Sequence, residues 1–143
     1  MLTGLLFGQD VIQIKTGTSF GMCSGYCLSE LNIIGSEADY YLNSWIEDDS
    51  VYQTVEISDV IDSSIWENLN TFLDFELFMN LDTIYGCPDC ADGGAEWFEI
   101  ATSDTIKRVT IEYGDSLDGF NNFIDLLRSV RYSFQEIQAC YYI

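Results

Sequence analysis

The sequence predicts an α+β domain, a two-layer sandwich in which two helices cover a mostly antiparallel sheet of about five to six strands. Three observations support this prediction. Short segments alternate apolar and polar residues and are joined by tight turns, which favours antiparallel pairing. Two other segments carry apolar residues at helical spacing. The elements run in the order strands, helix, strands, helix, which is typical of α+β folds.

Four strands are predicted in the first part of the chain. Residues 11–16 alternate, and strand character returns at residues 28–34 after a glycine-rich segment that we expect to be a hairpin tip. Residues 40–47 and 51–57 alternate in the same manner, so they are the third and fourth candidates.

The first helix is predicted to begin at Ser64. Ser64 and Glu67 have the spacing of a capping box, in which hydroxyl and carboxylate satisfy each other's backbone donors. An apolar stripe at helical spacing follows: Ile65, Leu69, Phe72 and Leu73. From residue 74 the period is lost, which indicates an irregular exit from the helix.

Two more strands, residues 95–103 and 105–113, are predicted on either side of a short turn. A second helix is expected from Ser116, with Asp118 in the first turn and Arg128 and Arg131 in the last, as the helix dipole prefers. Its buried stripe is Leu117, Phe120, Phe123, Ile124 and Leu127. The tail after it fits either a strand or a helix.

The chain is strongly acidic. It has 5 Lys plus Arg against 24 Asp plus Glu, a formal net charge of −19, and no histidine. Such a field repels nucleic acid and anionic lipid, because binding them requires basic patches, so any protein partner is expected to be basic. Without histidine, Ser-His and Cys-His catalysis is excluded, and we expect no enzyme.

One domain is predicted over residues 11–143, because the chain has a single proline and no Gly/Ser-rich linker. Residues 1–10 are either the remnant of a leader or an N-terminal arm. No other segment approaches the roughly 20 apolar residues of a membrane helix. We therefore expect no membrane insertion of the mature chain.

Four of the five cysteines form two tight pairs, Cys23 with Cys27 and Cys87 with Cys90. Two structural disulfides, within or across the pairs, would indicate an exported protein. The same four residues would otherwise be the ligands of a four-cysteine zinc site, and no other cofactor is expected. A thiol redox couple at Cys87 and Cys90 is the enzymatic alternative, but a strand pattern follows them where such couples open a helix. Cys140 is expected to be a buried thiol.

Two further groups are candidate sites. Asp89, Asp92 and Glu96 surround the second pair, but they lack an EF-hand pattern and indicate a solvated acidic loop, as does the segment 47–50. The tryptophans could line a binding face, although most aromatic residues of a small domain belong to the core. They are Trp45, Trp66 and Trp97.

The segment around the first pair, together with the later Cys87/Cys90 loop and closing helix, resembles a group of uncharacterised bacterial domains. These open with a strand and a Phe-Gly-x-Cys hairpin tip ending in Tyr, and many occur in exported proteins or lipoproteins. The matching positions are Phe20, Gly21, Cys23 and Tyr26. Ser24 stands where proline is usual, and the other three paired cysteines are extra. The resemblance implies a fold and an exported location but no activity.

Two functions are consistent with these observations. The first is a non-catalytic domain, exported to the periplasm or cell surface, whose cysteines join the hairpin tip to the loop before the second strand pair. The second is a cytoplasmic acidic inhibitor or immunity-type protein that blocks a basic enzyme, with reduced cysteines and a structural zinc. It would present a contiguous acidic face.

Overall fold

Six strands form one antiparallel sheet in the computed structural model of this chain, which describes residues 10–46, 51–91 and 93–142. The strand order is β4-β3-β2-β1-β5-β6. The first four strands form a meander: β1 (Gln13–Ser19), β2 (Leu28–Ile34), β3 (Glu37–Asn43) and β4 (Val55–Val60). A second hairpin, β5 (Ala95–Ala101) and β6 (Ile106–Glu112), pairs with β1. The predicted α+β class is confirmed.

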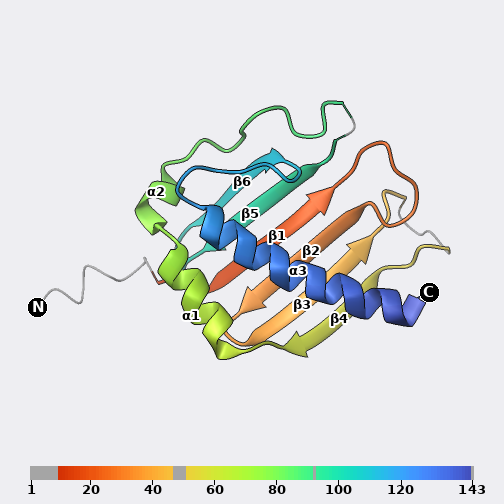
Figure 1. The fold of residues 1–143 in the computed structure, drawn as a ribbon, viewed down its shortest axis with the longest axis horizontal. Coiled ribbons are helices and arrows are strands. Elements are labelled where there is room, and N and C mark those ends of the chain that lie inside the picture. The colour runs from red at the N-terminus through yellow and green to blue at the C-terminus, as the bar shows by residue number, and fades with distance from the viewer. Residues whose placement is uncertain (1–9, 47–50, 92, 143) are drawn as a thin grey trace, which may run out of the picture.

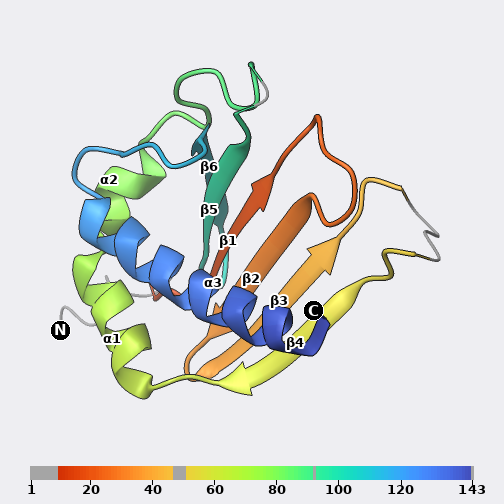
Figure 2. The same cartoon turned by 45° about the vertical axis from the view of Figure 1, so that its right-hand side comes forward.

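Three helices lie on the same face of this sheet (Figures 1 and 2). They are α1 (Ser63–Phe72), α2 (Phe75–Met79) and α3 (Asn121–Tyr142). The long helix α3 crosses the strands diagonally, and α1 and α2 lie beside its N-terminal half. No described element covers the other face, which we call the open face. All the described elements therefore share one layer of core, between sheet and helices.

The core follows from the alternation of the strands. Along β3, Ala38, Tyr40 and Leu42 are buried on the helix side, while the residues between them face the open side and are partly exposed. The helices add apolar side chains from above, and these include Leu69, Phe78, Phe123, Ile124 and Leu127. Each buried aliphatic or aromatic side chain contributes roughly 1.5–3 kcal/mol of transfer free energy, so this layer holds the two halves of the chain together.

The first helix begins at Ser63, one residue before the predicted start, but its predicted capping box is wrong. Asp62 is the N-cap of α1, and its carboxylate accepts a hydrogen bond from the backbone N–H of Ser64 at 2.9 Å. That bond lowers the pKa of Asp62. An aspartate before the helix therefore takes the capping role that the sequence pattern gave to Ser64. In the predicted stripe, Leu69 and Leu73 are buried, but Phe72 is 40% exposed.

The irregular exit predicted after residue 74 contains a short helix, α2. Asp74 is its N-cap and accepts a hydrogen bond from the backbone N–H of Leu77 at 3.1 Å. Phe78 of this helix is 1% exposed and meets Phe120 and Phe123 edge to face. A single buried aromatic side chain thus anchors a turn too short to show a helical period.

The second predicted helix begins later and ends later than expected. Its predicted stripe is buried, but Leu117 and Phe120 lie in the turn before α3, because Gly119 has φ +87° and breaks the helical path. The helix extends to Tyr142, so the ambiguous tail is helical. Arg128 and Arg131 consequently lie in the middle of α3 rather than in its last turn, and the dipole does not explain their position.

Strand ends also differ from the prediction. The third strand ends at Asn43, before Trp45, and the fourth begins at Val55. At the far edge of the sheet, residues around Ile84 run parallel to β6 and protect it, since Tyr85 donates its backbone N–H to Thr110.

Some predictions fall on residues that the structure does not describe. Residues 1–9, which make up most of the predicted leader remnant or arm, lie outside the described residues, as do the acidic segment 47–50 and the side chain of Cys140. Within the described part of the chain, no helix has the length and apolar character needed to span a membrane.

Candidate functional site

The tip of the β1–β2 hairpin is closed by the first cysteine pair. Cys23 and Cys27 are at disulfide distance, with S–S 2.01 Å and Cα–Cα 5.8 Å. Cys27 is 2% exposed, and its carbonyl accepts a hydrogen bond from the backbone N–H of Phe20. The pair therefore fixes the point where the two strands separate into the loop.

The second pair also closes on itself. The Cα atoms of Cys87 and Cys90 are 5.4 Å apart, and the sulfurs are at bonding distance. The backbone N–H of Cys90 donates to the carbonyl of Cys87, which makes this segment a turn. It leads into β5, not into a helix, so it lacks the helix N-terminus that lowers thiol pKa in thioredoxin-like couples.

Because both pairs are local, the cysteines do not cross-link the hairpin tip to the later loop, and that expectation is wrong. The two loops touch through other residues. Gly94 packs against the ring of Phe20, and Gly21 packs against the carboxylate of Asp89. The ring of Phe20 also meets Tyr113 edge to face at 5.0 Å. Packing thus joins the loops where a covalent bond was expected.

The four motif positions of the hairpin tip have separate structural roles. Phe20 and Gly21 contact the second cysteine loop, and Cys23 pairs with Cys27. Tyr26 donates its hydroxyl to the carbonyl of Gln53 at 2.8 Å and meets Tyr52 edge to face. The tip is therefore held from both sides, by the loop before β5 and by the segment before β4.

A metal site is not assembled from the predicted ligands. Four thiolates would be needed for zinc, and two disulfides leave none. In the part of the chain that the structure describes, no group of three or more Cys, Asp or Glu side chains could hold a metal ion. Of the calcium candidates, Glu96 is buried on the helix face, away from the loop of Asp89, and Asp92 lies outside the described residues.

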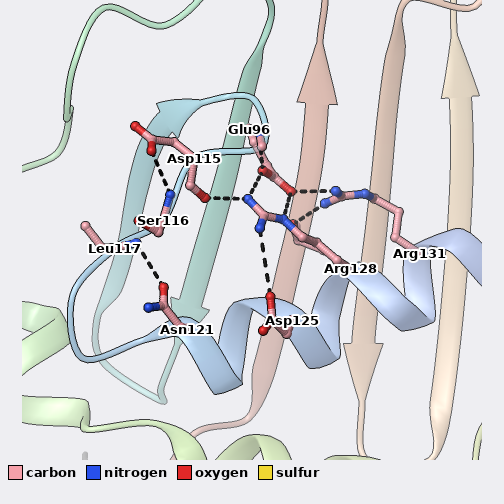
Figure 3. Close-up of polar contacts among 10 residues, drawn as sticks. Glu96, Asp115, Ser116, Leu117, Asn121, Asp125, Arg128 and Arg131 are labelled. Atoms are coloured by element: carbon pink, nitrogen blue, oxygen red, sulfur yellow. Dashed lines mark hydrogen bonds and ion pairs between the residues drawn. The ribbon is translucent and has the colours of Figure 1, made fainter.

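Glu96 is the centre of a buried ionic cluster that the sequence analysis did not find (Figure 3). Its carboxylate accepts hydrogen bonds from both Arg128 and Arg131 of α3, the shortest from Arg131 Nη2 at 2.5 Å. The backbone N–H of Gly114 donates to the same carboxylate at 3.1 Å. The carbonyl of Asp115 accepts a further bond from Arg128.

Burial and charge act in opposite directions on this carboxylate. Burial raises the pKa of Glu96, but the hydrogen bonds and positive charges of Arg128 and Arg131 lower it by more, so the net shift is downward. Arg131 also donates to the hydroxyl of Thr16 on β1 at 3.0 Å. Glu96 and Arg131 are almost completely buried, whereas the Arg128 side chain is 16% exposed, and the cluster positions α3 on the sheet.

A signal for this cluster was present in the alternation of β5. Glu96, Phe98 and Ile100 are spaced two residues apart and therefore lie on the same face of β5, which faces the core. The sequence thus has an acidic residue at a position where the pattern calls for an apolar one. Its partners lie 32 and 35 residues away in sequence. Only the packing of α3 across β5 brings them together.

The open face is organised in rows that cross the six strands. Strand register gives two neighbouring rows, which we name the arginine row and the aromatic row. The arginine row is Ser58, Asp39, Asn32, Lys15, Glu99 and Arg108. The aromatic row is Glu56, Tyr41, Glu30, Gly17, Trp97 and Thr110.

The three tryptophans do not form one binding face. Trp97 lies on the open face, whereas Trp66 belongs to α1 and packs against the core from the helix side. Trp45 donates its indole N–H to the carbonyl of Phe20 at 2.6 Å and supports the hairpin tip. An aromatic patch built from all three is therefore excluded.

All five positive side chains of the chain interact with other groups of the same chain. Arg128 and Arg131 hold Glu96, and Lys107 donates to the carbonyls of Met79 and Leu81 beneath α2. The remaining two lie on the open face, where each has a glutamate partner: Lys15 with Glu30 at 4.0 Å and Arg108 with Glu99 at 3.0 Å. The surface that remains is dominated by carboxylates.

Comparison with protein-family models finds no match for this chain, and no curated protein matches it.

Proposed function

We propose that this chain is a non-catalytic acidic domain that binds a basic protein, and that it works in an oxidising compartment outside the cytoplasm, with its paired cysteines as structural disulfides. The proposal rests on one observation: all five positive side chains already have partners within the chain. Two of them, Lys15 and Arg108, pair with glutamates on an open face rich in carboxylates. These two are the positive side chains that a basic partner meets on this face, each beside a glutamate, and the opposite field of the acidic chain accelerates encounter.

Two local disulfides support the exported location. Such bonds persist in oxidising compartments and are rare in the reducing cytoplasm. Each closes a short loop, and Cys27 is buried beneath the hairpin tip. The resemblance to exported bacterial domains points in the same direction and stays a prediction.

A cytoplasmic inhibitor or immunity-type protein is the second candidate, and the carboxylates of the open face favour it too. Such a protein would use the same face to block a basic enzyme. The two candidates differ in the cysteines, because the inhibitor requires free thiols or a bound zinc in place of the disulfides.

Thiol trapping in intact producing cells tests the proposed location. Alkylation before lysis, followed by intact-mass measurement and zinc quantification, should show no zinc and no alkylation of Cys23, Cys27, Cys87 and Cys90 in the exported fraction. Alkylation of all four of these cysteines in the cytoplasmic fraction would contradict this result and favour the inhibitor.

Partner capture tests the binding function. Bound proteins from the same cells are quantified for the wild type, for Glu30→Gln/Glu56→Gln on the open face, and for Glu67→Gln/Glu136→Gln on the helices. Basic proteins should be enriched at about 50 mM salt, lost at about 500 mM salt, and lost in the first variant alone. Both variants remove two exposed or half-exposed carboxylates. If both lost the captured proteins equally, binding would depend on the net charge of the chain and not on the open face.

A further inference from the structure

One guanidinium already lies on an aromatic ring of the open face. The guanidinium carbon of Arg108 on β6 is 3.6 Å from the ring centroid of Trp97 on β5. The same side chain donates through Nε to Glu99 at 3.0 Å. The arrangement has three parts: an aromatic residue, an acid two positions along the same strand, and an arginine opposite that acid on the edge strand.

The other half of the face has an aromatic residue and an acid in the same two rows, in mirror order across the strands and with the arginine missing. Tyr41 of β3 stands in the aromatic row with Trp97, and Asp39, two positions along, stands in the arginine row with Glu99. Opposite Asp39 on edge strand β4 is Ser58, in the place that Arg108 has opposite Glu99. Ser58 donates its hydroxyl to Asp39 at 2.6 Å, but its short side chain supplies no cation for the ring.

More negative charge surrounds this half than the first. Tyr41 lies between Glu30 on β2 and Glu56 on β4. Burial and the negative charges of Asp39, Glu56 and Glu30 raise the pKa of Tyr41. Lys15 is the one positive residue near them, at 4.0 Å from Glu30, and the chain contains no other lysine or arginine before Lys107.

We propose that Tyr41, with Asp39, Glu30 and Glu56, is a docking site for an arginine side chain of the basic protein partner. This inference rests on the proposed function and names the chemistry of its partner. The planar guanidinium stacks on the tyrosine ring and donates to the flanking carboxylates, as Arg108 does on Trp97 and Glu99. Lysine fits less well, because its compact ammonium is strongly hydrated and lacks a flat face.

A peptide titration followed by NMR tests the site. The probe is an acetylated, amidated Gly-Arg-Gly-Arg-Gly peptide, with the lysine peptide of equal charge as comparison. Amide shifts should concentrate on β2, β3 and β4, and the arginine peptide should bind more tightly, by about threefold. Tyr41→Leu should weaken the arginine peptide by about threefold and remove the preference over lysine.

A gain-of-function variant checks the geometry independently. Ser58→Arg places a guanidinium opposite Asp39, where Arg108 stands opposite Glu99, so the protein should occupy its own site. The arginine peptide should then bind at least about fivefold more weakly, because the new side chain covers the ring of Tyr41 and neutralises Asp39. Ser58→Gln, of intermediate length and without charge, is the matched control and should leave binding unchanged.

Several results would overturn the inference. They are shifts spread over both faces of the protein, equal binding of the two peptides, or an affinity for the arginine peptide that Tyr41→Leu and Ser58→Arg leave unchanged. If partner capture still depends on Glu30 and Glu56 in that case, the proposed function stands and only the arginine site fails. Both variants alter exposed or half-exposed side chains, and unchanged amide spectra elsewhere establish that each folds.

Discussion

Glu96 of β5 and Arg131 of α3 form an ion pair in which both side chains are almost completely buried, with exposures of 0% and 1%. The pair connects β5, the strand next to edge strand β6, to the middle of the helix that covers the sheet. Taking both charges out of water is costly, and the cost is offset only while every partner stays in place. The position of α3 on the sheet therefore depends on this carboxylate as well as on the apolar side chains that the helix contributes to the core.

Replacement of that carboxylate should be strongly destabilising. In Glu96→Gln the buried guanidinium of Arg131 loses its counter-charge, and Arg128 loses its stronger partner. We expect the free energy of unfolding to fall by about 3–5 kcal/mol, measured by urea denaturation. Glu67→Gln, on the exposed surface of α1, is the control and should change stability by less than about 0.5 kcal/mol. A loss below about 1 kcal/mol in Glu96→Gln would mean that the cluster does not hold α3.

The same cluster predicts how stability depends on pH. The pKa of Glu96 is lowered from its ordinary value of 4.5, with the raising effect of burial outweighed by Arg128 and Arg131. A lowered folded-state pKa gives a stabilising contribution that is present above 4.5 and is lost as pH falls through the folded value. The difference in unfolding free energy between wild type and Glu96→Gln should therefore be constant near neutral pH and shrink in acid.

Urea denaturation of both proteins between about pH 7 and about pH 2.5 checks this expectation. The comparison between the two proteins is needed because protonation of the other 23 acidic residues relieves repulsion within a chain of net charge −19, which acts in the opposite direction. A difference that stays constant throughout the range would contradict a lowered pKa at Glu96.

Two tyrosines, Tyr40 and Tyr26, allow a matched test of how a hydrogen bond to the hydroxyl affects stability. Tyr40 is buried and Tyr26 is half-buried. Tyr40 is 0% exposed and its hydroxyl has no hydrogen-bond partner among the described residues, whereas Tyr26 donates to Gln53 at 2.8 Å. Burial raises the pKa of Tyr40, and Gln135, Arg131 and Ser29 offset only part of that effect. The Tyr40 hydroxyl is therefore desolvated without full compensation.

We expect Tyr40→Phe to leave stability unchanged or to raise it by up to about 1 kcal/mol, because it removes an unsatisfied polar atom. Tyr26→Phe should instead cost about 1 kcal/mol, since it removes a made hydrogen bond. Thermal unfolding of the two variants gives the comparison. The reverse order of stabilities would contradict an unsatisfied Tyr40 hydroxyl and would mean that it is hydrogen-bonded, with Gln135 and Ser29 as the neighbouring side chains.

The strands were predictable because their signal is local. Alternation placed β1, β2, β5 and β6 and their two hairpins, since a strand with one buried face repeats every two residues. The cap of α1 and the start of α3 were not, because Asp62 competes with Ser64 as a cap and Gly119 interrupts the approach to α3. Contacts between segments that are far apart in the sequence are harder to predict from the sequence pattern. The acid at position 96 was visible, but its arginine partners depend on how α3 crosses the sheet.

The last prediction concerns Gly17, a member of the aromatic row. The ring of Trp97 lies over this glycine. A Cβ atom there would meet both the carbonyl of Ser29 on β2 and the Trp97 ring. Gly17→Ala must therefore disturb the β1–β2 pairing or displace Trp97, and through it Arg108, from the open face. Overpacking of this kind costs about 1–3 kcal/mol.

Gly93→Ala is the control for this substitution, because nothing lies within 4 Å of a Cβ at that position. Urea denaturation with near-UV circular dichroism should give a loss of stability and a changed tryptophan signal in Gly17→Ala alone. Equal behaviour of the two variants would mean that Trp97 and Arg108 adjust freely. Their stacking would then be too loose to serve as the pattern for an arginine at Tyr41.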